Sequence, residues 1–150
     1  MGAYTLSKYC QPAGFDEGYG YDGYSDNLIV LLPEDDAATA NWGEGWRMPT
    51  YDEWLELYQN TTFTWADQNS VIGIKFSAPN GNSIFIPAAG YYIENQLYDY
   101  EGHYWSSSLM PDYPLNAGLW SCNEDEEGGL GMSSNARANG LSVRPVRSSR

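Results

Sequence analysis

Basic residues are scarce in this sequence: seven Lys and Arg stand against twenty Asp and Glu, giving a formal net charge of −13. Proteins that bind nucleic acid neutralise phosphates with Lys and Arg, so this balance argues against a nucleic-acid partner. An anionic membrane surface is disfavoured for the same reason. A neutral glycan, a basic protein surface or a metal ion is compatible with the charge.

Long apolar runs are also lacking. The longest, Leu28 to Leu32, has the length of a strand and is too short to cross a membrane. We interpret this run as a buried strand or a core-facing segment. The N-terminal residues Met1 to Tyr4 show no basic segment followed by an apolar one, as a secretion signal would. We therefore expect no direct membrane insertion by this chain.

Closely spaced cysteines are missing as well. Cys10 and Cys122 lie far apart and form no CxxC motif, which leaves little support for a zinc or redox site. They could form one long-range disulfide or remain two buried thiols, and the spacing leaves both possibilities open.

Catalytic motifs are equally scarce. The chain has one histidine, His103, and neither a phosphate-binding glycine loop nor a Gly-x-Ser-x-Gly elbow. The serines at residues 106–108 have no His or Lys placed by the sequence to activate them. We therefore predict a protein that is not an enzyme.

Aromatic residues and glycines, by contrast, are plentiful. Six Trp, thirteen Tyr and 42% hydrophobic residues indicate a folded chain, and 150 residues suit a single domain spanning residues 1–150. Sixteen Gly and eight Pro predict many turns and short elements. Residues 1–25 are rich in Tyr and Gly and are expected to form an irregular segment.

Two helices are predicted early in the chain. Residues 33–40 begin with Pro and three acids, which favour a helix start, and Gly43 is expected to end this helix. Calcium binding by these acids is the alternative interpretation. Thr50 and Glu53 form a capping-box pattern ahead of a second helix that ends near Asn60.

Strands are predicted after these helices. An Asn-Gly turn at residues 80–81 separates two β-rich runs and predicts a hairpin. Runs suited to strands occur at residues 71–76, 83–87, 103–108, 117–122, 129–133 and 141–146. The last of these is expected to close the sheet, by pairing of the N- and C-terminal strands. We predict an α+β fold with two helices packed on short antiparallel sheets with long loops.

Several motifs occur in a fixed order along the chain. They are EDDAA at 34–38, NWG at 41–43, WRMPT at 46–50 with Glu53, NGNSIFIPAAG at 80–90, GHYWSSS at 102–108 and GLSVRPV at 140–146. This string resembles the Fibrobacter succinogenes major paralogous domain, over about residues 26 to 147. Such domains are abundant in surface lipoproteins and secreted proteins of Bacteroides-type gut bacteria.

The resemblance implies a C-type-lectin-like fold, related to the formylglycine-generating-enzyme superfamily and to variable proteins diversified by retroelements. It implies a cell-surface or secreted location, with the signal or anchor outside this chain. The oxidase chemistry of the related enzymes depends on a close cysteine pair, which Cys10 and Cys122 do not provide. We therefore expect a non-catalytic extracellular ligand-binding domain, lectin-like or adhesin. The alternatives are a retroelement-diversified receptor, a structural module of a surface assembly and, third, a formylglycine-generating-type enzyme.

By analogy with such folds, the loops between residues 91 and 139 are expected to bind an extracellular protein or glycan. Aromatic rings there can stack on a sugar or anchor a protein contact, and polar neighbours can orient it. The candidate ligand-binding residues are Tyr98, Tyr104, Tyr113, Asn116, Trp120, Asn123, Asp125, Asn135, Arg137 and Asn139. For Trp120, a place in the core is an equal alternative.

No cofactor is expected, with one open alternative. The acidic loop at residues 123–127 could hold a structural calcium through Asn123, Glu124 and Asp125, or it could simply be solvated. The sugar-binding Glu-Pro-Asn and Gln-Pro-Asp signatures are absent from the sequence, which argues against calcium-dependent sugar chelation. Arg47 and Arg144 are expected to join polar networks with acids such as Asp35 or Glu53.

Overall fold

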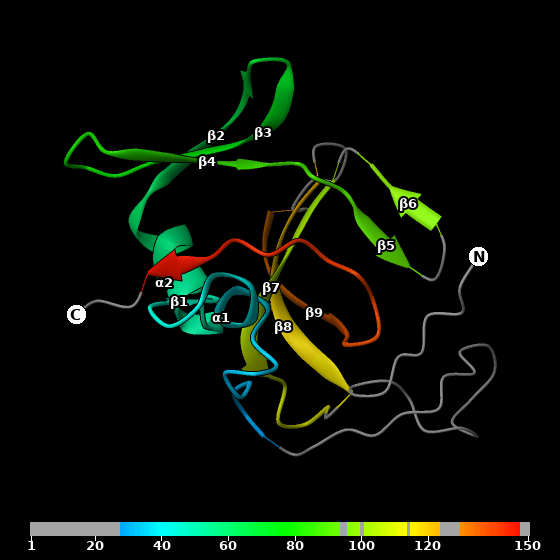
Figure 1. Ribbon diagram of the computed structural model, residues 1–150. Helices are drawn as coiled ribbons and strands as arrows, with labels where there is room; N and C mark the ends of the chain where they lie inside the picture. Colours follow the sequence, from blue (N-terminus) through cyan, green and yellow to red (C-terminus); the bar gives the residue numbers. More distant parts are fainter. Residues whose placement is uncertain (1–27, 94–95, 100, 114, 124–129, 148–150) are drawn as a thin grey trace.

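The computed structural model describes residues 28–93, 96–99, 101–113, 115–123 and 130–147 (Figure 1). The irregular segment predicted at residues 1–25 lies outside this part of the chain. The elements are α1 (Ala37–Trp42), β1 (Trp46–Arg47), α2 (Tyr51–Asn60), β2 (Thr62–Gln68), β3 (Val71–Ser77), β4 (Ser83–Pro87), β5 (Tyr91–Ile93), β6 (Gln96–Tyr98), β7 (Glu101–Leu109), β8 (Asn116–Asn123), β9 (Leu130–Ala136) and β10 (Val146–Arg147).

These strands form short antiparallel sheets with the orders β1-β10, β2-β3-β4, β5-β6 and β7-β8-β9. Together with α1 and α2 they make a mixed α+β structure, which confirms this part of the predicted fold class. Within the described residues, no helix is long and apolar enough to span a membrane.

The second helix forms as its capping box predicts. The Thr50 hydroxyl accepts a hydrogen bond from the Glu53 amide, and the Glu53 carboxylate accepts one from the Thr50 amide. Arg47 then holds Glu53 with a two-pronged ion pair of 2.5 and 2.6 Å, so the expected network of Arg47 is confirmed. Arg144, in contrast, is exposed.

The first helix begins later than predicted. Residues 33–35 form a turn, and α1 starts at Ala37 because the Asp36 carboxylate accepts hydrogen bonds from the amides of Ala38 and Thr39, both at 2.9 Å. The same carboxylate accepts a hydrogen bond from the Met48 amide at 2.8 Å, which ties the helix start to the segment after β1. Gly43, with φ of 81°, ends the helix as predicted.

The predicted Asn-Gly hairpin is present as β3 and β4, and Gly81 adopts a φ of 88° that favours glycine. A strand that the sequence analysis missed, β2, pairs along the whole of β3. Exposed and half-buried residues alternate over the first four positions of β2, as the pleat of a strand requires, although its sequence TFTWADQ is largely polar. This sheet projects away from the helices (Figure 1).

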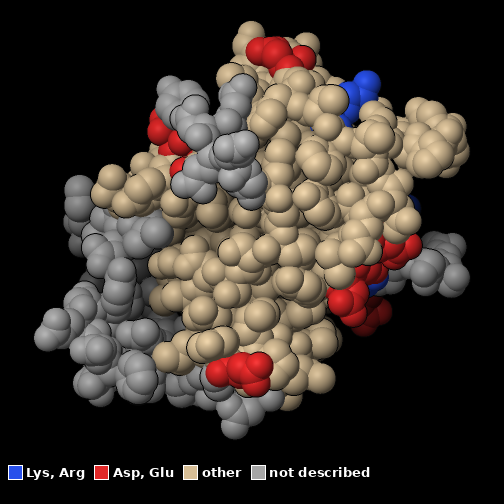
Figure 2. Space-filling view, turned by 180° about the vertical axis from the view of Figure 1, so that it is seen from behind, with Lys and Arg blue, Asp and Glu red and all other residues tan. Residues whose placement is uncertain are grey.

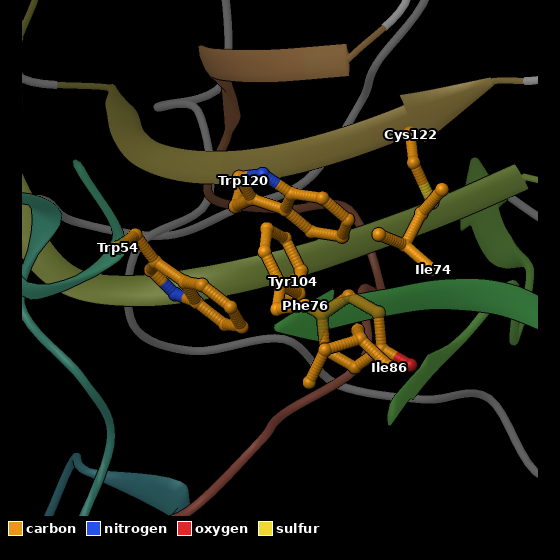
Figure 3. Packing of buried hydrophobic residues seen from close by; sticks show 7 residues of the cluster. All are labelled: Trp54, Ile74, Phe76, Ile86, Tyr104, Trp120 and Cys122. Atoms are coloured by element: carbon orange, nitrogen blue, oxygen red, sulfur yellow. The ribbon is translucent and has the colours of Figure 1, made fainter. Parts of the chain in front are cut away.

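The core lies between α2, the β2-β3-β4 sheet and the central sheet β7-β8-β9. Trp120 of β8 is completely buried, stacks on Trp54 of α2 at 5.6 Å and meets Phe76 of β3 edge-on at 5.3 Å (Figure 3). Ile74 and Ile86 fill the remaining space with no measurable exposure. One Trp thus joins elements from three parts of the chain.

Two predicted strands differ from the structure. The run Leu28 to Leu32 pairs with the end of β7 through Leu31 and Ile29, but it lies at an edge, and Ile29 and Val30 are 66% and 48% exposed. The prediction that Leu28 to Leu32 forms a buried strand is therefore wrong. Residues 141–146 form only an isolated bridge at Ser142, and the regular pairing is confined to β10 with β1.

Candidate ligand-binding surface

Two of the predicted ligand-binding residues belong to the core. Trp120 has no exposed surface and Tyr104 is 4% exposed, with its ring 6.0 Å from that of Trp54. The Tyr104 hydroxyl donates a hydrogen bond to the carbonyl of Pro87 at 2.7 Å. Neither ring can stack on a ligand from this position, so both are corrected to core residues. Tyr104 of β7 and Trp120 of β8 lie directly opposite each other, and the strand register that turns both toward the core cannot be read from the sequence.

Five other predicted residues gather at one end of the central sheet. They lie where β7 ends, β8 begins and β9 ends: Tyr113, Asn116, Asn135, Arg137 and Asn139. We call this group the amide surface.

The β7–β8 connection presents Tyr113 on a hydrogen-bonded frame. Asn116 donates its amide to the carbonyl of Tyr113 at 2.8 Å, and Tyr113 donates its own to Met110 at 3.0 Å. The Met110 amide in turn reaches the carbonyl of Asn116 at 3.1 Å. Tyr113 is 64% exposed, so its ring is presented to solvent on an ordered turn. Within the described residues the side-chain carboxamide of Asn116 makes no hydrogen bond, which leaves its NH₂ donor and its oxygen acceptor for a ligand.

The turn after β9 completes the amide surface. The side-chain oxygen Oδ1 of Asn135 accepts hydrogen bonds from the Ala136 backbone amide at 2.8 Å and from the Asn139 side-chain amide at 2.9 Å. The Arg137 amide donates to Leu115 at 2.9 Å and joins this turn to the β7–β8 connection. Asn135 therefore supports the turn, and Asn139 keeps its side-chain carbonyl for a ligand.

A cavity of about 150 Å³ adjoins this surface. Its lining consists of Leu31, Asp35, Ala37, Met48, Trp105, Ser106, Ser107, Ser108, Leu109, Ala117, Arg137 and Val143. Arg137 belongs to both the cavity lining and the amide surface, and nothing in the sequence predicted that residues 31–48 would lie beside them. Contacts between such distant segments depend on the tertiary fold.

The remaining predicted residues are placed elsewhere. Asn123 and Tyr98 belong to the other end of the sheet, where Asn123 pairs with Glu101 in the β7–β8 register. Because β8 is 8 residues long, the two ends are separated by on the order of 20 Å. Asp125 lies outside the described residues, as does Glu124.

At this second end, the structure assembles a cluster that the sequence analysis missed. The Tyr91 ring stacks on Tyr98 at 5.0 Å and lies 4.1 Å from the ring of His103. His103 Nε2 lies 2.9 Å from a carboxylate oxygen of Glu101. Glu101 and His103 are two residues apart, and this spacing could have predicted that both side chains lie on the same face of a strand. It does not indicate which ring packs against them.

The other ring nitrogen of His103, Nδ1, is buried and has no hydrogen-bond partner within the described part of the chain. Cys122 is a free, buried thiol, and burial raises its pKa to about 12. Cys10, the other residue of the open disulfide alternative, lies outside the described residues.

The electrostatics of the molecule are uneven. Figure 2 shows Asp and Glu in small separate groups near the margins of one face, with uncharged side chains across its middle. Within the described residues, no group of three or more His, Cys, Asp or Glu side chains is arranged to hold a metal ion. Of the three residues in the calcium alternative, Glu124 and Asp125 lie outside the described residues, and only Asn123 lies within them.

Comparison of the chain with protein-family models, curated proteins and solved structures found no match in any of the three.

Proposed function

We propose that this chain is a non-catalytic ligand-binding domain of a bacterial surface or secreted protein, with a C-type-lectin-like fold. Its ligand is an extracellular protein or glycan. One observation carries the proposal: five residues chosen from sequence as ligand contacts meet at one end of the central sheet. They come from two segments, the β7–β8 connection with the start of β8 and the end of β9 with the turn after it. The hydrogen bond from the Arg137 amide to the Leu115 carbonyl joins these segments.

The amide surface suits recognition rather than chemistry. Tyr113 offers a large ring on an ordered turn, so little conformational entropy is lost when a ligand packs on it. Asn116 and Asn139 add neutral donors and acceptors, which match the hydroxyls of a glycan or the backbone of a peptide. The negative net charge disfavours acidic ligands.

A C-type-lectin-like fold is supported by the pairing of β1 with β10, which brings the C-terminal segment beside the early part of the chain. The ordered motifs GHYWSSS and GLSVRPV lie next to each other through the bridge between Tyr104 and Ser142.

The test is a binding screen of the purified chain against glycans and bacterial or host surface proteins, with and without calcium. We expect a ligand whose affinity falls at least about tenfold in the variant Tyr113→Ala/Asn139→Ala, as for loss of a central aromatic contact. Tyr92→Ala is the matched control, since Tyr92 is 50% exposed but lies on β5.

Equal binding by the double variant would refute the amide surface as the site. A loss with Tyr92→Ala instead would transfer the site to the β5–β6 hairpin. Absence of any ligand in both panels would reject the binding function and favour a structural module of a surface assembly. If binding requires calcium, the alternative in which the loop at residues 123–127 holds a calcium ion would be supported.

A further inference from the structure

A second cavity, of about 300 Å³, lies between α2, β4 and the segment that leads into β10. Its floor belongs to the core, since Trp54 and Ile86 are 3% and 0% exposed and Pro49 is buried. The segment before β10 passes beside α2 (Figure 1), and Pro145 and Val146 supply one wall. This volume lies at the lower limit of small-molecule pockets and is about twice that of a cavity that holds benzene.

The walls above the floor are aliphatic. Leu57 of α2 and Val146 of β10 are half-buried, and Ile84 of β4 stands at the rim with 41% of its surface exposed. The one aromatic ring in the lining, that of Trp54, already stacks on Trp120 at 5.6 Å. The cavity therefore favours a flexible hydrocarbon chain over a flat ring, which would need a free aromatic face for stacking.

Three residues of the lining have no backbone N–H to offer a ligand. Pro49 and Pro145 lack the group altogether. The Trp54 amide donates to the Thr50 carbonyl at 3.2 Å at the start of α2. A peptide ligand is held through its backbone as well as through side-chain pockets, so these walls suit a ligand that is mostly hydrocarbon.

One unpaired charge stands at the mouth of the cavity. Arg144 is exposed, and within the described residues its guanidinium makes no hydrogen bond or ion pair. The Tyr104 hydroxyl is no counter-ion for it, because burial raises the pKa of Tyr104 to about 12. Glu53, the other charged residue of the lining, is already held by Arg47 through both carboxylate oxygens. The cavity thus combines apolar walls with one positive charge that is available to a ligand.

We propose that this cavity binds a medium-chain fatty acid in its carboxylate form, such as octanoate. The hydrocarbon chain lies between Leu57, Ile84 and Val146. The carboxylate meets Arg144, because a guanidinium presents donors in a fork that matches both carboxylate oxygens. A single negative charge suits the site, since the net charge of −13 disfavours a dianion. The site shares no residue with the amide surface, so it is separate from the recognition proposed there.

An NMR titration of the ¹⁵N-labelled full chain tests the proposal. Octanoate should give saturable shifts of the Leu57, Ile84 and Val146 amides at millimolar concentration or below. The affinity should rise about fourfold for each methylene group added from butanoate to octanoate, as burial of each group predicts. Octylammonium, which has the same chain and the opposite charge, should bind at least about fivefold more weakly.

Two matched pairs of variants locate the site. Arg144→Gln should weaken octanoate at least about fivefold without changing the affinity for uncharged 1-octanol. Arg147→Gln is its control, because Arg147 is also exposed but lies over the Trp46 ring, 5.4 Å from its centroid, and outside the lining. Ile84→Asp places a carboxylate in the apolar wall and should abolish octanoate binding. Ile72→Asp, at a strand position that is 44% exposed and outside the lining, should bind octanoate like the parent chain.

Circular dichroism checks that the variants are folded. Absence of saturable shifts with millimolar octanoate would overturn the proposal, as would equal binding of octylammonium or an unchanged octanoate affinity in folded Arg144→Gln. Tighter binding of a short acetylated peptide that ends in leucine would also overturn it, in favour of a peptide C-terminus. The double variant Tyr113→Ala/Asn139→Ala should bind octanoate like the parent chain, so failure of this site and failure of the amide surface are distinguishable.

Discussion

Replacement of Trp120 by alanine gives the most direct test of the core. Trp120 was a candidate ligand contact in the sequence, and the structure places it at the junction of α2, β3 and β8 with no exposed surface. Its ring lies within 5.6 Å of both Trp54 and Phe76, measured between centroids. The variant should therefore lose stability rather than ligand affinity alone.

The size of the effect follows from this packing. Truncation of a buried Trp to Ala costs about 3–5 kcal/mol, through lost burial and the cavity left behind. Since domains have unfolding free energies of about 5–15 kcal/mol, the loss is about 40% of the unfolding free energy at the middle of both ranges. For a chain of this length the melting temperature should fall by roughly 6–20 °C.

Trp120→Phe should be much milder. Within the described residues the indole Nε1 of Trp120 is buried without a hydrogen-bond partner. Its removal recovers about 1–3 kcal/mol of desolvation cost, which offsets part of the lost volume. We expect a net loss of about 1 kcal/mol or less.

Urea unfolding followed by far-UV circular dichroism measures these differences at constant m-value. Trp42→Ala is the control, because Trp42 is 55% exposed and its loss should change stability by no more than about 0.5 kcal/mol. A Trp120→Ala chain as stable as the Trp42→Ala chain would refute the placement of Trp120 in the core.

Two further predictions concern Glu53 and Gly102. The hydrogen bond from Arg47 lowers the pKa of Glu53 to about 2 from 4.5, so the stability that this pair contributes is complete above about pH 4.5 and is lost as the pH falls toward 2. Glu53→Gln should flatten the acid limb of the stability curve in urea titrations between those pH values, and an unchanged slope would contradict the ion pair. At Gly102, an added Cβ would lie 2.6 Å from Cys122 Sγ, so Gly102→Ala should cost about 1–3 kcal/mol. Addition of Cys122→Ala should recover part of that loss in a double-mutant cycle, whereas simple additivity would show that the thiol is not the clashing group.

Local features were predictable because the residues that make them are close in sequence. The capping box of Thr50 and Glu53 and the Asn-Gly turn at residues 80–81 each depend on a few neighbouring side chains and on backbone conformations that glycine favours. By contrast, β2 was missed because its stability comes from pairing along β3 rather than from its own composition. The segment Leu28 to Leu32 shows the opposite error, since hydrophobicity alone does not say whether a strand lies inside a sheet or at its edge.

The candidate site divides in the same way. The sequence alone shows that residues 91–139 carry aromatic and amide side chains in turn-rich segments. It also shows that Lys and Arg, which would neutralise an acidic ligand, are few. The tertiary structure was needed to show that Trp120 and Tyr104 face the core, that Tyr113 and Asn139 lie at one end of the central sheet, and that Asp35 and Arg137 both line one cavity. The physical reason is strand register: a shift of one residue turns every side chain of a strand to the other face, and the register is set by packing between distant segments.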